Sequence, residues 1–322
     1  MSNYKKISGN IETVVIDNPK TQKEKLTWVN INNAGKKEIE YLRKKYKFDL
    51  KNLQASSGKS IAQRPIINQE GDYLFLILHF PVLSEGSVVA EEVDFFIGHG
   101  FLVTLHNGHL NSIYDFFNTC KKDENSLLTY KFESSAILLY ELLERLMLSC
   151  YPLLDQNSVA IEKAEKSIFA QNQKEAVAQI LSLKRNIINL RKILQSHKNI
   201  LKKLTEMKSS LVPEKEIKKH YYRLVEHSKK IWEFLESQKE MVEALYATNE
   251  SLLSYRISNI MKTLTIFSVI VFPLTLLAAI FGMNTVNGMP FMNAENGFWM
   301  IIGIMLMGSM GMLIFFERKK WL

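Results

Sequence analysis

The run TLTIFSVIVFPLTLLAAIF, from Thr263 to Phe281, contains no charged side chain, and neither does GFWMIIGIMLMGSMGMLIFF, from Gly297 to Phe316. At ~1.5 Å rise per residue, a helix over either run is roughly 30 Å long, which matches the hydrocarbon core of a bilayer. Charged residues are spread almost continuously from Met1 to Lys262. The sequence therefore predicts a large water-exposed part followed by two membrane-spanning helices.

Basic residues flank the two runs at the ends that are not joined to each other. Arg256 and Lys262 precede the first run and Arg318–Lys320 follow the second, whereas residues 282–296 contain no Lys or Arg and one acid, Glu295. Basic residues near a span favour the cytoplasmic side. We therefore expect a multi-pass protein of the cell membrane with both termini in the cytoplasm and a short external loop, whose Glu295 attracts cations. The opening MSNYKKISGN has no apolar stretch, so no cleaved signal peptide is expected.

The net charge of +8 does not by itself indicate a nucleic-acid partner. Lys and Arg alternate with Glu along predicted helices, without a nucleic-acid-binding motif, so no such partner is expected. The densest basic stretch, 196–230, is interpreted as a solvated face near an anionic lipid surface. Cys120 and Cys150 then lie on the reducing side and need not pair. No glycine-rich phosphate loop, nucleophile elbow or catalytic dyad is recognisable, so no enzyme is predicted.

The water-exposed part divides into a strand-rich and a helix-rich region. The predicted strands are Glu12–Ile16, Thr27–Ile31, Tyr73–Pro81, Ser87–Ile97 and Gly100–His106. A helical segment, Lys36–Lys45, separates two of them. From Phe132 onward, apolar residues recur at three- and four-residue spacing, which predicts helices over Ser135–Ala170 and Lys174–Met207.

A single long helix is predicted from Pro213 to Phe281, because no further proline occurs before Pro273. Ser209 and Ser210 mark a break before it, and Pro213 suits its first turn. Its apolar positions form a narrow stripe, namely Leu224, Ile231, Leu235, Val242, Leu245, Leu252 and Ile260. One chain offers such a helix too few neighbours, so packing against copies of itself is expected. The sequence therefore predicts a homo-oligomer.

These features define an α+β cytoplasmic domain followed by long helices and two C-terminal transmembrane helices. The predicted segments are the cytoplasmic α/β domain 1–131, a cytoplasmic helical hairpin 132–212, a stalk helix 213–262, a first span 263–281, an external loop 282–296, a second span 297–316 and a basic cytoplasmic tail 317–322. The first span is the one expected to line a pore.

At the end of the first span the chain reads Phe281-Gly282-Met283-Asn284. An aromatic residue followed by Gly-Met-Asn at this place resembles the signature of the CorA family of magnesium and divalent-cation transporters. Further stretches that resemble the family are Gln63–Pro65, Phe101–Thr104, Leu183–Asn186, Met261–Thr265, Pro273–Thr275, Met289–Pro290 and Lys319–Leu322. The resemblance covers nearly the whole chain. It implies a funnel-shaped homopentamer in membrane lipid, with one axial pore, Mg²⁺ as the transported ion and no cofactor.

The resemblance makes Gly282, Met283 and Asn284 the selectivity filter. Mg²⁺ holds its waters tightly, so stripping all of them at a pore mouth is slow and costly. A ring of carboxamide oxygens from Asn284 can instead accept hydrogen bonds from those waters and thereby recognise the hydrated ion. Gly282 is expected to let the backbone leave the helix, and Met283 to pack against the turn. The alternative is that Asn284 only caps a helix end.

The family's pore face corresponds to one side of the first span and the end of the stalk, at intervals of three or four residues. Its members are Ser258, Met261, Leu264, Ser268, Phe272, Thr275 and Ala279. Thr275 offers hydroxyl oxygens as an inner metal site, whereas the apolar members offer constrictions that can gate by dewetting. Simple packing is an alternative role for each. Ser258 and Ala279 stand where the family usually has Asn and Gly, and neither change removes an ion ligand.

In well-studied relatives, Mg²⁺ bound between subunits holds the closed state through acids on the soluble domain and the stalk. Here Lys51 and Asn52 stand where two acids are expected, and Leu224 stands at the place of the third. Losing these carboxylates is expected to weaken divalent binding sharply. Asp49 and Glu226 are the remaining, doubtful candidates for a regulatory metal site.

A transporter of the same fold for Zn²⁺, Co²⁺ or Ni²⁺ is the nearest alternative. Zinc-moving relatives often vary the Met of the signature, so Met283 argues mildly against zinc. A non-conducting, membrane-anchored sensor is an alternative from another class. The histidines weighed as zinc ligands are His99, His106, His109, His220 and His227. They lack a zinc-site spacing, so they are expected to be satisfied by other partners or to face solvent.

Overall fold

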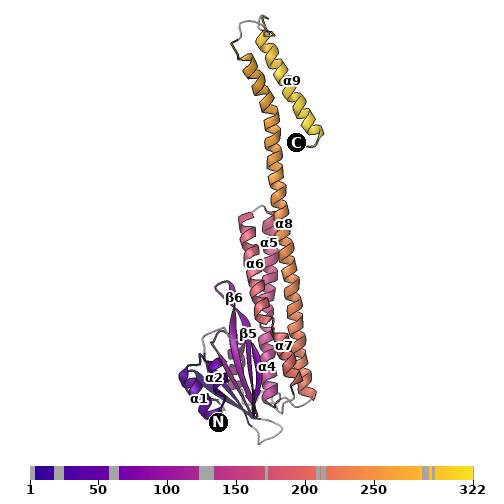
Figure 1. The fold of residues 1–322 in the computed structure, drawn as a ribbon. Coiled ribbons are helices and arrows are strands. Elements are labelled where there is room, and N and C mark those ends of the chain that lie inside the picture. Colours follow the sequence, from indigo (N-terminus) through magenta and orange to yellow (C-terminus); the bar gives the residue numbers. More distant parts are fainter. Residues whose placement is uncertain are drawn as a thin grey trace. The chain divides into compact units, whose positions relative to one another are not determined.

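The structure is a computed structural model that describes residues 4–17, 25–57, 65–122, 134–170, 173–207, 211, 215–284, 290–291 and 294–321. The chain forms two compact units, Met1–Leu245 and Tyr246–Leu322 (Figure 1). Several residues that the sequence analysis singles out lie outside the described residues, namely Gln63, Arg64, Ser209, Ser210, Pro213, Met289 and Leu322.

The described part of the first unit contains a seven-stranded mixed sheet in the order β1-β2-β3-β7-β6-β5-β4. The strands are β1 (Tyr4–Lys6), β2 (Ile11–Asp17), β3 (Lys25–Asn32), β4 (Ile66–Glu70), β5 (Tyr73–Ser84), β6 (Ser87–Gly98) and β7 (Phe101–His106). Neighbours are antiparallel except β3 and β7, which run parallel. The five predicted strands are confirmed. The pattern does not predict β1 and β4, because both are short edge strands with mostly exposed side chains.

Both faces of this sheet are covered, so its central strands are apolar on both sides. In β5, Leu74, Leu76 and Leu78 belong to one buried cluster, while the alternating Phe75 and Ile77 belong to another. Successive side chains of a strand point to opposite faces, so an uninterrupted apolar run is what a doubly covered strand requires.

Helices from different parts of the chain cover the two faces (Figure 1). The bounds in this unit are α1 (Lys36–Tyr46), α2 (Leu50–Ala55), α3 (Asn111–Lys122), α4 (Ser135–Leu148), α5 (Tyr151–Phe169), α6 (Gln173–Leu194) and α7 (His197–Glu206). Leu42 of α1 and Leu53 of α2 pack on the face of Phe75. Apolar residues of α3, α4, α6 and α7 pack on the face of Leu74.

The long helix α8 (Lys215–Phe281) begins in the first unit and packs there against its own chain. Tyr221, Leu224, Ile231, Leu235 and Val242 are all buried. The Tyr221 hydroxyl donates a hydrogen bond to the carbonyl oxygen of Ala136 at 2.6 Å. The expectation that this stripe has too few neighbours in one chain is therefore wrong for its N-terminal part, because the helices after the sheet supply them.

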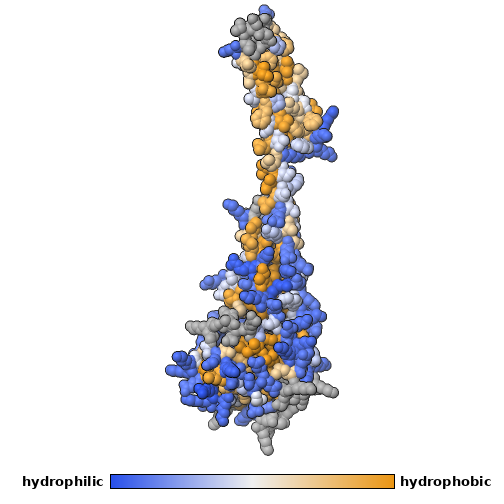
Figure 2. Space-filling model, viewed as in Figure 1, coloured by the Kyte–Doolittle hydropathy of each residue, from blue (hydrophilic) through white to orange (hydrophobic). Residues whose placement is uncertain are grey.

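The second unit contains the remainder of α8 and the helix α9 (Gly297–Arg318), and both helices are long and apolar enough to cross a membrane. Among the described residues of this unit, Ile266 and Phe316 are the only buried apolar side chains. Its surface in Figure 2 is accordingly dominated by apolar residues. Such a surface is stable only in lipid or against other protein.

Candidate ion-conduction site

The residues of the predicted pore face lie on one side of α8, and the described part of the chain leaves most of them uncovered. Leu264 is 58% exposed and Phe272 is 72% exposed, and Met261 is exposed as well. Ser258, Thr275 and Ala279 are also exposed, whereas Ser268 is half-buried. A helix face that mixes hydroxyl groups with large uncovered apolar side chains fits a lining that other copies of the helix complete.

The hydroxyl groups on this face are anchored by the helix backbone. Thr275 Oγ1 donates to the carbonyl oxygen of Val271 at 2.9 Å, and Ser268 Oγ donates to that of Leu264 at 2.9 Å. A hydroxyl that donates its single hydrogen in this way keeps its oxygen lone pairs as acceptors or ligands. The Thr275 oxygen is therefore oriented with its electron-rich side away from the backbone acceptor and is suited to meet a cation.

Pro273 lies inside α8, in the turn that carries Thr275. Proline has no N–H, so the carbonyl oxygen of Val269 loses its partner four residues later in the helix. Freed carbonyl groups at membrane depth are tolerated where they are re-satisfied or face a polar cavity. The helix nevertheless continues to Phe281, which keeps the whole face on one element.

The Gly-Met-Asn tripeptide lies where α8 ends. Gly282 N–H still donates to Ala278 at 2.9 Å, while Met283 N–H donates only three residues back, to Ile280, at 3.3 Å. The backbone of Gly282 is not in the left-handed region, so conformational freedom is not what requires glycine here. A Cβ at this position would lie 3.1 Å from the carbonyl oxygen of Ala278, so a larger residue fits only if the end of the helix shifts slightly.

Asn284 follows this tightened turn, and its side chain is exposed. Its carboxamide makes no hydrogen bond to any described residue, so it does not serve as a helix cap within them. Met283 is 55% exposed in the single chain. The packing expected for Met283 is therefore not made within its own described chain. Both side chains are left available at the end of the helix.

The segment before α9 has a steric requirement that sequence reasoning missed. Ala294 N–H donates to Phe291 at 3.3 Å, and Gly297 N–H donates to Ala294 at 3.0 Å. A Cβ on Gly297 would lie only 2.0 Å from the carbonyl oxygen of Phe291. The expected cation-attracting acid, Glu295, is exposed in this turn. The sequence signal for this tight turn was a glycine, Gly297, at the start of the second span and directly after a short connection.

At the other end of the second unit, the C-terminal residues fold back on the helices. Lys262 Nζ donates to the carbonyl oxygen of Lys320 at 3.0 Å. The rings of Phe316 and Trp321 stack with centroids 5.8 Å apart. The Lys262 hydrogen bond links α8 to the residues that follow α9, and the ring stacking holds those residues against the end of α9.

Most of the positions considered for a regulatory metal site make structural contacts within the first unit. Asp49 is the N-cap of α2 and accepts a hydrogen bond from the Lys51 N–H at 2.7 Å. Asn52 donates to the Tyr73 hydroxyl at 2.9 Å and is buried. Leu224 is fully buried in its own subunit's core. Of these positions, Glu226 is the one exposed acid for which the described residues show no hydrogen bond or ion pair.

The histidines do not assemble into a metal centre. The described residues contain no group of three or more His, Cys, Asp and Glu side chains placed to hold a metal ion. His109 pairs with Glu91 at 2.6 Å, and His99 is exposed. His106 is buried and hydrogen-bonded to Asn30 at 3.0 Å. Burial lowers the pKa of His106 to about 4, with a smaller contribution from His109, so this ring is neutral.

Residues 23–319 of this chain, more than half of its length, match the family described as CorA-like Mg²⁺ transporter protein. The chain is a member of the CorA family. The cobalt/magnesium transport protein CorA of Thermotoga maritima is 24% identical over 298 residues, covering 92% of this chain and 83% of the relative. CorA of Methanocaldococcus jannaschii is 22% identical over 315 residues, covering 98% and 97%.

The complete structure of the CorA magnesium transporter of Methanocaldococcus jannaschii superposes on this chain with a TM-score of 0.80, at 21% identity, and 92% of each chain is covered. CorA membership and the fold class expected from the resemblance are thus confirmed. The family consists of transporters, and this chain carries the two apolar helices that a membrane transporter requires.

Proposed function

We propose that this chain forms a homopentameric Mg²⁺ channel or transporter in the cell membrane, with the five α8 helices around one axial pore. One observation carries the proposal: within the described residues most of the pore face of α8 is exposed, and the helix is followed by the exposed carboxamide of Asn284. The names of the relatives support the ion, since CorA of Thermotoga maritima is a cobalt/magnesium transport protein.

Selection takes place at the tripeptide Gly282-Met283-Asn284. Mg²⁺ gives up its inner waters reluctantly, so a filter that accepts hydrogen bonds from those waters avoids the dehydration cost. The Asn284 carboxamide is neutral and free of other described partners, so a ring of five can contact a hydrated ion without trapping it by charge. Gly282 fits this role because a larger residue would crowd Ala278.

Deeper in the pore, Thr275 forms an inner site with its oxygen lone pairs. Met261, Leu264 and Phe272 line apolar constrictions between the polar positions, and rings of such residues can close a pore by excluding water. Ser258, Ser268 and Ala279 complete the face. Alternation of polar and apolar rings allows an ion to bind weakly at successive places, which conduction requires.

Both termini lie in the cytoplasm, and residues 282–296 face outside. The basic residues beside each span support this orientation through the positive-inside rule. Glu295 then raises the concentration of cations at the external mouth. A membrane potential that is negative inside contributes roughly 2.3 kcal/mol per charge per 100 mV, and a divalent ion benefits twice. Uptake therefore needs no further energy source.

Transport of Co²⁺, Ni²⁺ or Zn²⁺ by the same pore is the nearest alternative, and a non-conducting sensor is the alternative from another class. Flux of Mg²⁺, Co²⁺, Ni²⁺ and Zn²⁺ into proteoliposomes containing the purified full chain separates them. We expect Mg²⁺ flux that responds to an imposed potential. A folded, inserted protein that moves none of these ions would identify the sensor instead.

Asn284→Ala tests the filter directly. We expect it to abolish Mg²⁺ flux while leaving the oligomer intact in size-exclusion chromatography. The matched control is Asn296→Ala, because Asn296 is also exposed and, although it precedes α9, it makes no side-chain capping bond. Wild-type flux in Asn284→Ala would refute the role of Asn284, whereas loss of flux in both variants would point to a general defect of this end of the spans.

A further inference from the structure

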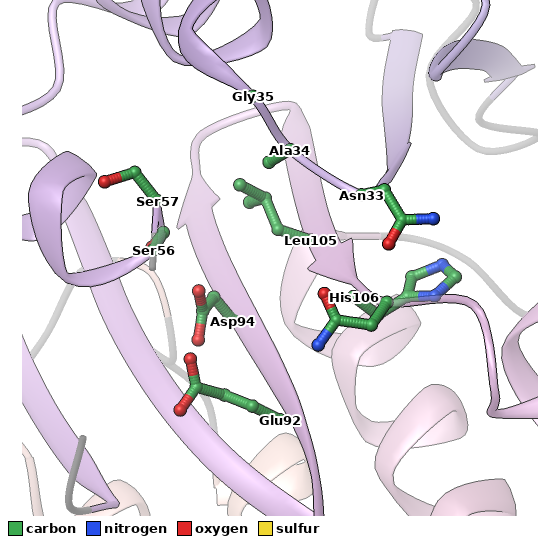
Figure 3. Close-up of a pocket in the computed structure, with 10 residues that line it drawn as sticks. Asn33, Ala34, Gly35, Ser56, Ser57, Glu92, Asp94, Leu105 and His106 are labelled. Carbon is green, nitrogen blue, oxygen red and sulfur yellow. The ribbon is translucent and has the colours of Figure 1, made fainter. Parts of the chain in front are cut away.

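A cavity of about 190 Å³ opens in the first unit, between the ends of α2 and the strands β6 and β7. Its lining includes Asn33, Ser56, Ser57, Glu92, Asp94 and His106. Figure 3 shows the carboxylates of Glu92 and Asp94 directed toward one another at this cavity, with the two serines on one side. A volume of this size has room for several water molecules.

Asp94 places a buried carboxylate in this cavity. The residue is only 3% exposed, and its Oδ1 has no hydrogen-bond partner among the described residues. Burial, followed by the charge of Glu92, raises the pKa of Asp94 well above its ordinary value, and Ser56 only partly opposes this through a hydrogen bond. A buried carboxylate oxygen without a partner is costly unless something positive or hydrogen-bonding meets it.

Glu92 supplies the second acid from the same strand. Positions 92 and 94 are two apart on β6, so both side chains point to the same face of the sheet. One oxygen of Glu92 lies 3.0 Å from His79 Nε2. That contact fixes the direction of the carboxylate and leaves its other oxygen for the cavity. Two converging carboxylates repel each other unless one of them is protonated or a cation lies between them.

The remaining lining groups determine which cation suits the cavity. His106 accepts a hydrogen bond from Gly108 N–H at Nδ1, 3.0 Å, and pairs through Nε2 with Asn30 at 3.0 Å. Both ring nitrogens are therefore occupied, and His106 is not available as a ligand. The available donors are oxygens, from Glu92, Asp94, the serines and water. Oxygen-only ligands with room for water suit Mg²⁺ or a similar hard divalent ion, and not Zn²⁺.

We propose that Glu92 and Asp94 form a binding site for one partly hydrated hard divalent cation within each subunit. The two carboxylates hold the ion, while waters in the cavity complete its coordination and contact Ser56 and Ser57. The site lies inside the first unit and uses residues of a single chain. It is therefore distinct from the pore, which requires several copies of α8, and from the positions of Asp49 and Glu226.

Counting bound Mn²⁺ by electron paramagnetic resonance, on the purified full chain in detergent, tests this site. An ion on the pore axis is shared by all subunits, whereas the proposed site adds one ion per chain. We expect about one Mn²⁺ per chain, displaced by Mg²⁺, and loss of that ion in Asp94→Asn with affinity reduced roughly tenfold or more. Glu91→Gln is the matched control, because its side chain is on the other face and pairs with His109.

Thermal unfolding provides the second measurement. Mg²⁺ is expected to raise the melting temperature of the wild type and of Glu91→Gln, but not that of Asp94→Asn. If Asp94→Asn does not fold, Glu92→Gln replaces it, with the same loss of bound Mn²⁺ expected.

If the wild-type protein binds much less than one Mn²⁺ per chain, the proposed site is refuted, independently of the results for the variants. Equal Mn²⁺ counts and equal Mg²⁺ responses in the wild type and Asp94→Asn would overturn it as well. Neither measurement involves transport. A failure of the proposed channel function would therefore leave this result unaffected, and the reverse also holds.

Discussion

The two parts of α8 have opposite environments although they belong to one continuous helix. In the first unit, Leu224 and Leu235 are fully buried by helices and strands of their own chain. In the second unit, Leu264 and Phe272 are largely exposed. Both stretches repeat apolar residues every three or four positions. The same periodicity therefore serves a core within the chain in one place and a surface for lipid or other subunits in the other.

This difference teaches that periodicity reports a buried face and does not identify what buries it. Charged residues make the distinction. Around Leu235 the neighbouring turns carry the exposed acids Glu233 and Glu240, which mark the face toward water. From Thr263 to Phe281 no charge remains, so the whole circumference avoids water.

The comparison predicts an all-or-none difference in accessibility from outside the cell. A cysteine replacing Asn296 is expected to react completely with an impermeant maleimide in intact cells, whereas one replacing Ser209 should not react. The native thiols give little background, because burial raises the pKa of both Cys120 and Cys150 to about 12. External labelling at Ser209→Cys would contradict the proposed orientation.

A matched pair of substitutions measures the two environments directly. Leu235→Ala leaves a cavity in the core and is expected to lower the free energy of unfolding by about 2–5 kcal/mol. Leu264→Ala, at a position 58% exposed in the chain, is expected to change it by less than ~0.5 kcal/mol. Chemical denaturation in detergent measures both free-energy changes. In the fraction of each variant that folds, we expect ion flux to change for Leu264→Ala and not for Leu235→Ala. Equal destabilisation would show that Leu264 is buried in the folded subunit.

The short connection between the spans predicts a smaller but specific effect. Gly297→Ala places a Cβ where Phe291 already lies, so the turn must shift, at a cost of about 1–3 kcal/mol. Gly303→Ala is the control in the same helix, because nothing lies within 4 Å of a Cβ there. Melting temperature in detergent compares the two. A Gly297→Ala protein as stable as Gly303→Ala would mean that the turn differs from the one described.

The smallest effect is expected from divalent ions at the subunit interface. The resemblance predicts that Lys51, Asn52 and Leu224 stand where relatives have acids. We therefore expect the proposed pentamer to be equally symmetric in Mg²⁺ and in chelator, and the protease-cleavage pattern of the stalk to be the same in both. A ligand that does not distinguish two states cannot shift their balance. Limited proteolysis followed by mass spectrometry measures this.

Mg²⁺-dependent protection of the stalk that disappears in Glu226→Ala would show a displaced interfacial site. Lys229→Ala, one turn further along the same helix, is the control, because Lys229 is exposed and carries no carboxylate. Asp49→Ala is less informative, since Asp49 caps α2 and its removal has a structural cost of about 1 kcal/mol.

The sequence predicts most of the fold because its strong signals are long. The apolar runs of β5 and β6 and the two charge-free spans are each longer than the apolar stretches found in turns or loops. All four are found as predicted. The edge strands β1 and β4 escape prediction, since an edge strand needs no apolar alternation. The self-association expected for the whole apolar stripe of α8 is wrong for Leu224 to Val242. Helices α4–α6 of the same chain pack against this part, and the local sequence does not show that contact.

At the candidate sites, too, the sequence predicts some features and the structure alone shows others. The charge-free run and the Phe281–Asn284 signature indicate the family without any coordinates, and the resemblance then predicts the pore face. The reason for Gly282 is different from the expected one, since a contact with Ala278, four residues earlier on the helix, becomes visible only when the backbone is built. The pairing of Glu92 and Asp94 is visible as two acids at spacing two in an apolar strand, a signal that sequence analysis alone left unused.

The sequence by itself determined which segments avoid water, their order along the chain and the membership in the CorA family. These properties follow from the composition of contiguous segments, so they need no knowledge of distant contacts. Only the tertiary structure decided that one face of the N-terminal part of α8 is buried in its own subunit, that Gly297 lies against Phe291, and that Oδ1 of Asp94 has no hydrogen-bond partner among the described residues. Each of these depends on which atoms meet across the fold, and the free energy of such contacts is set by geometry that the local sequence does not contain.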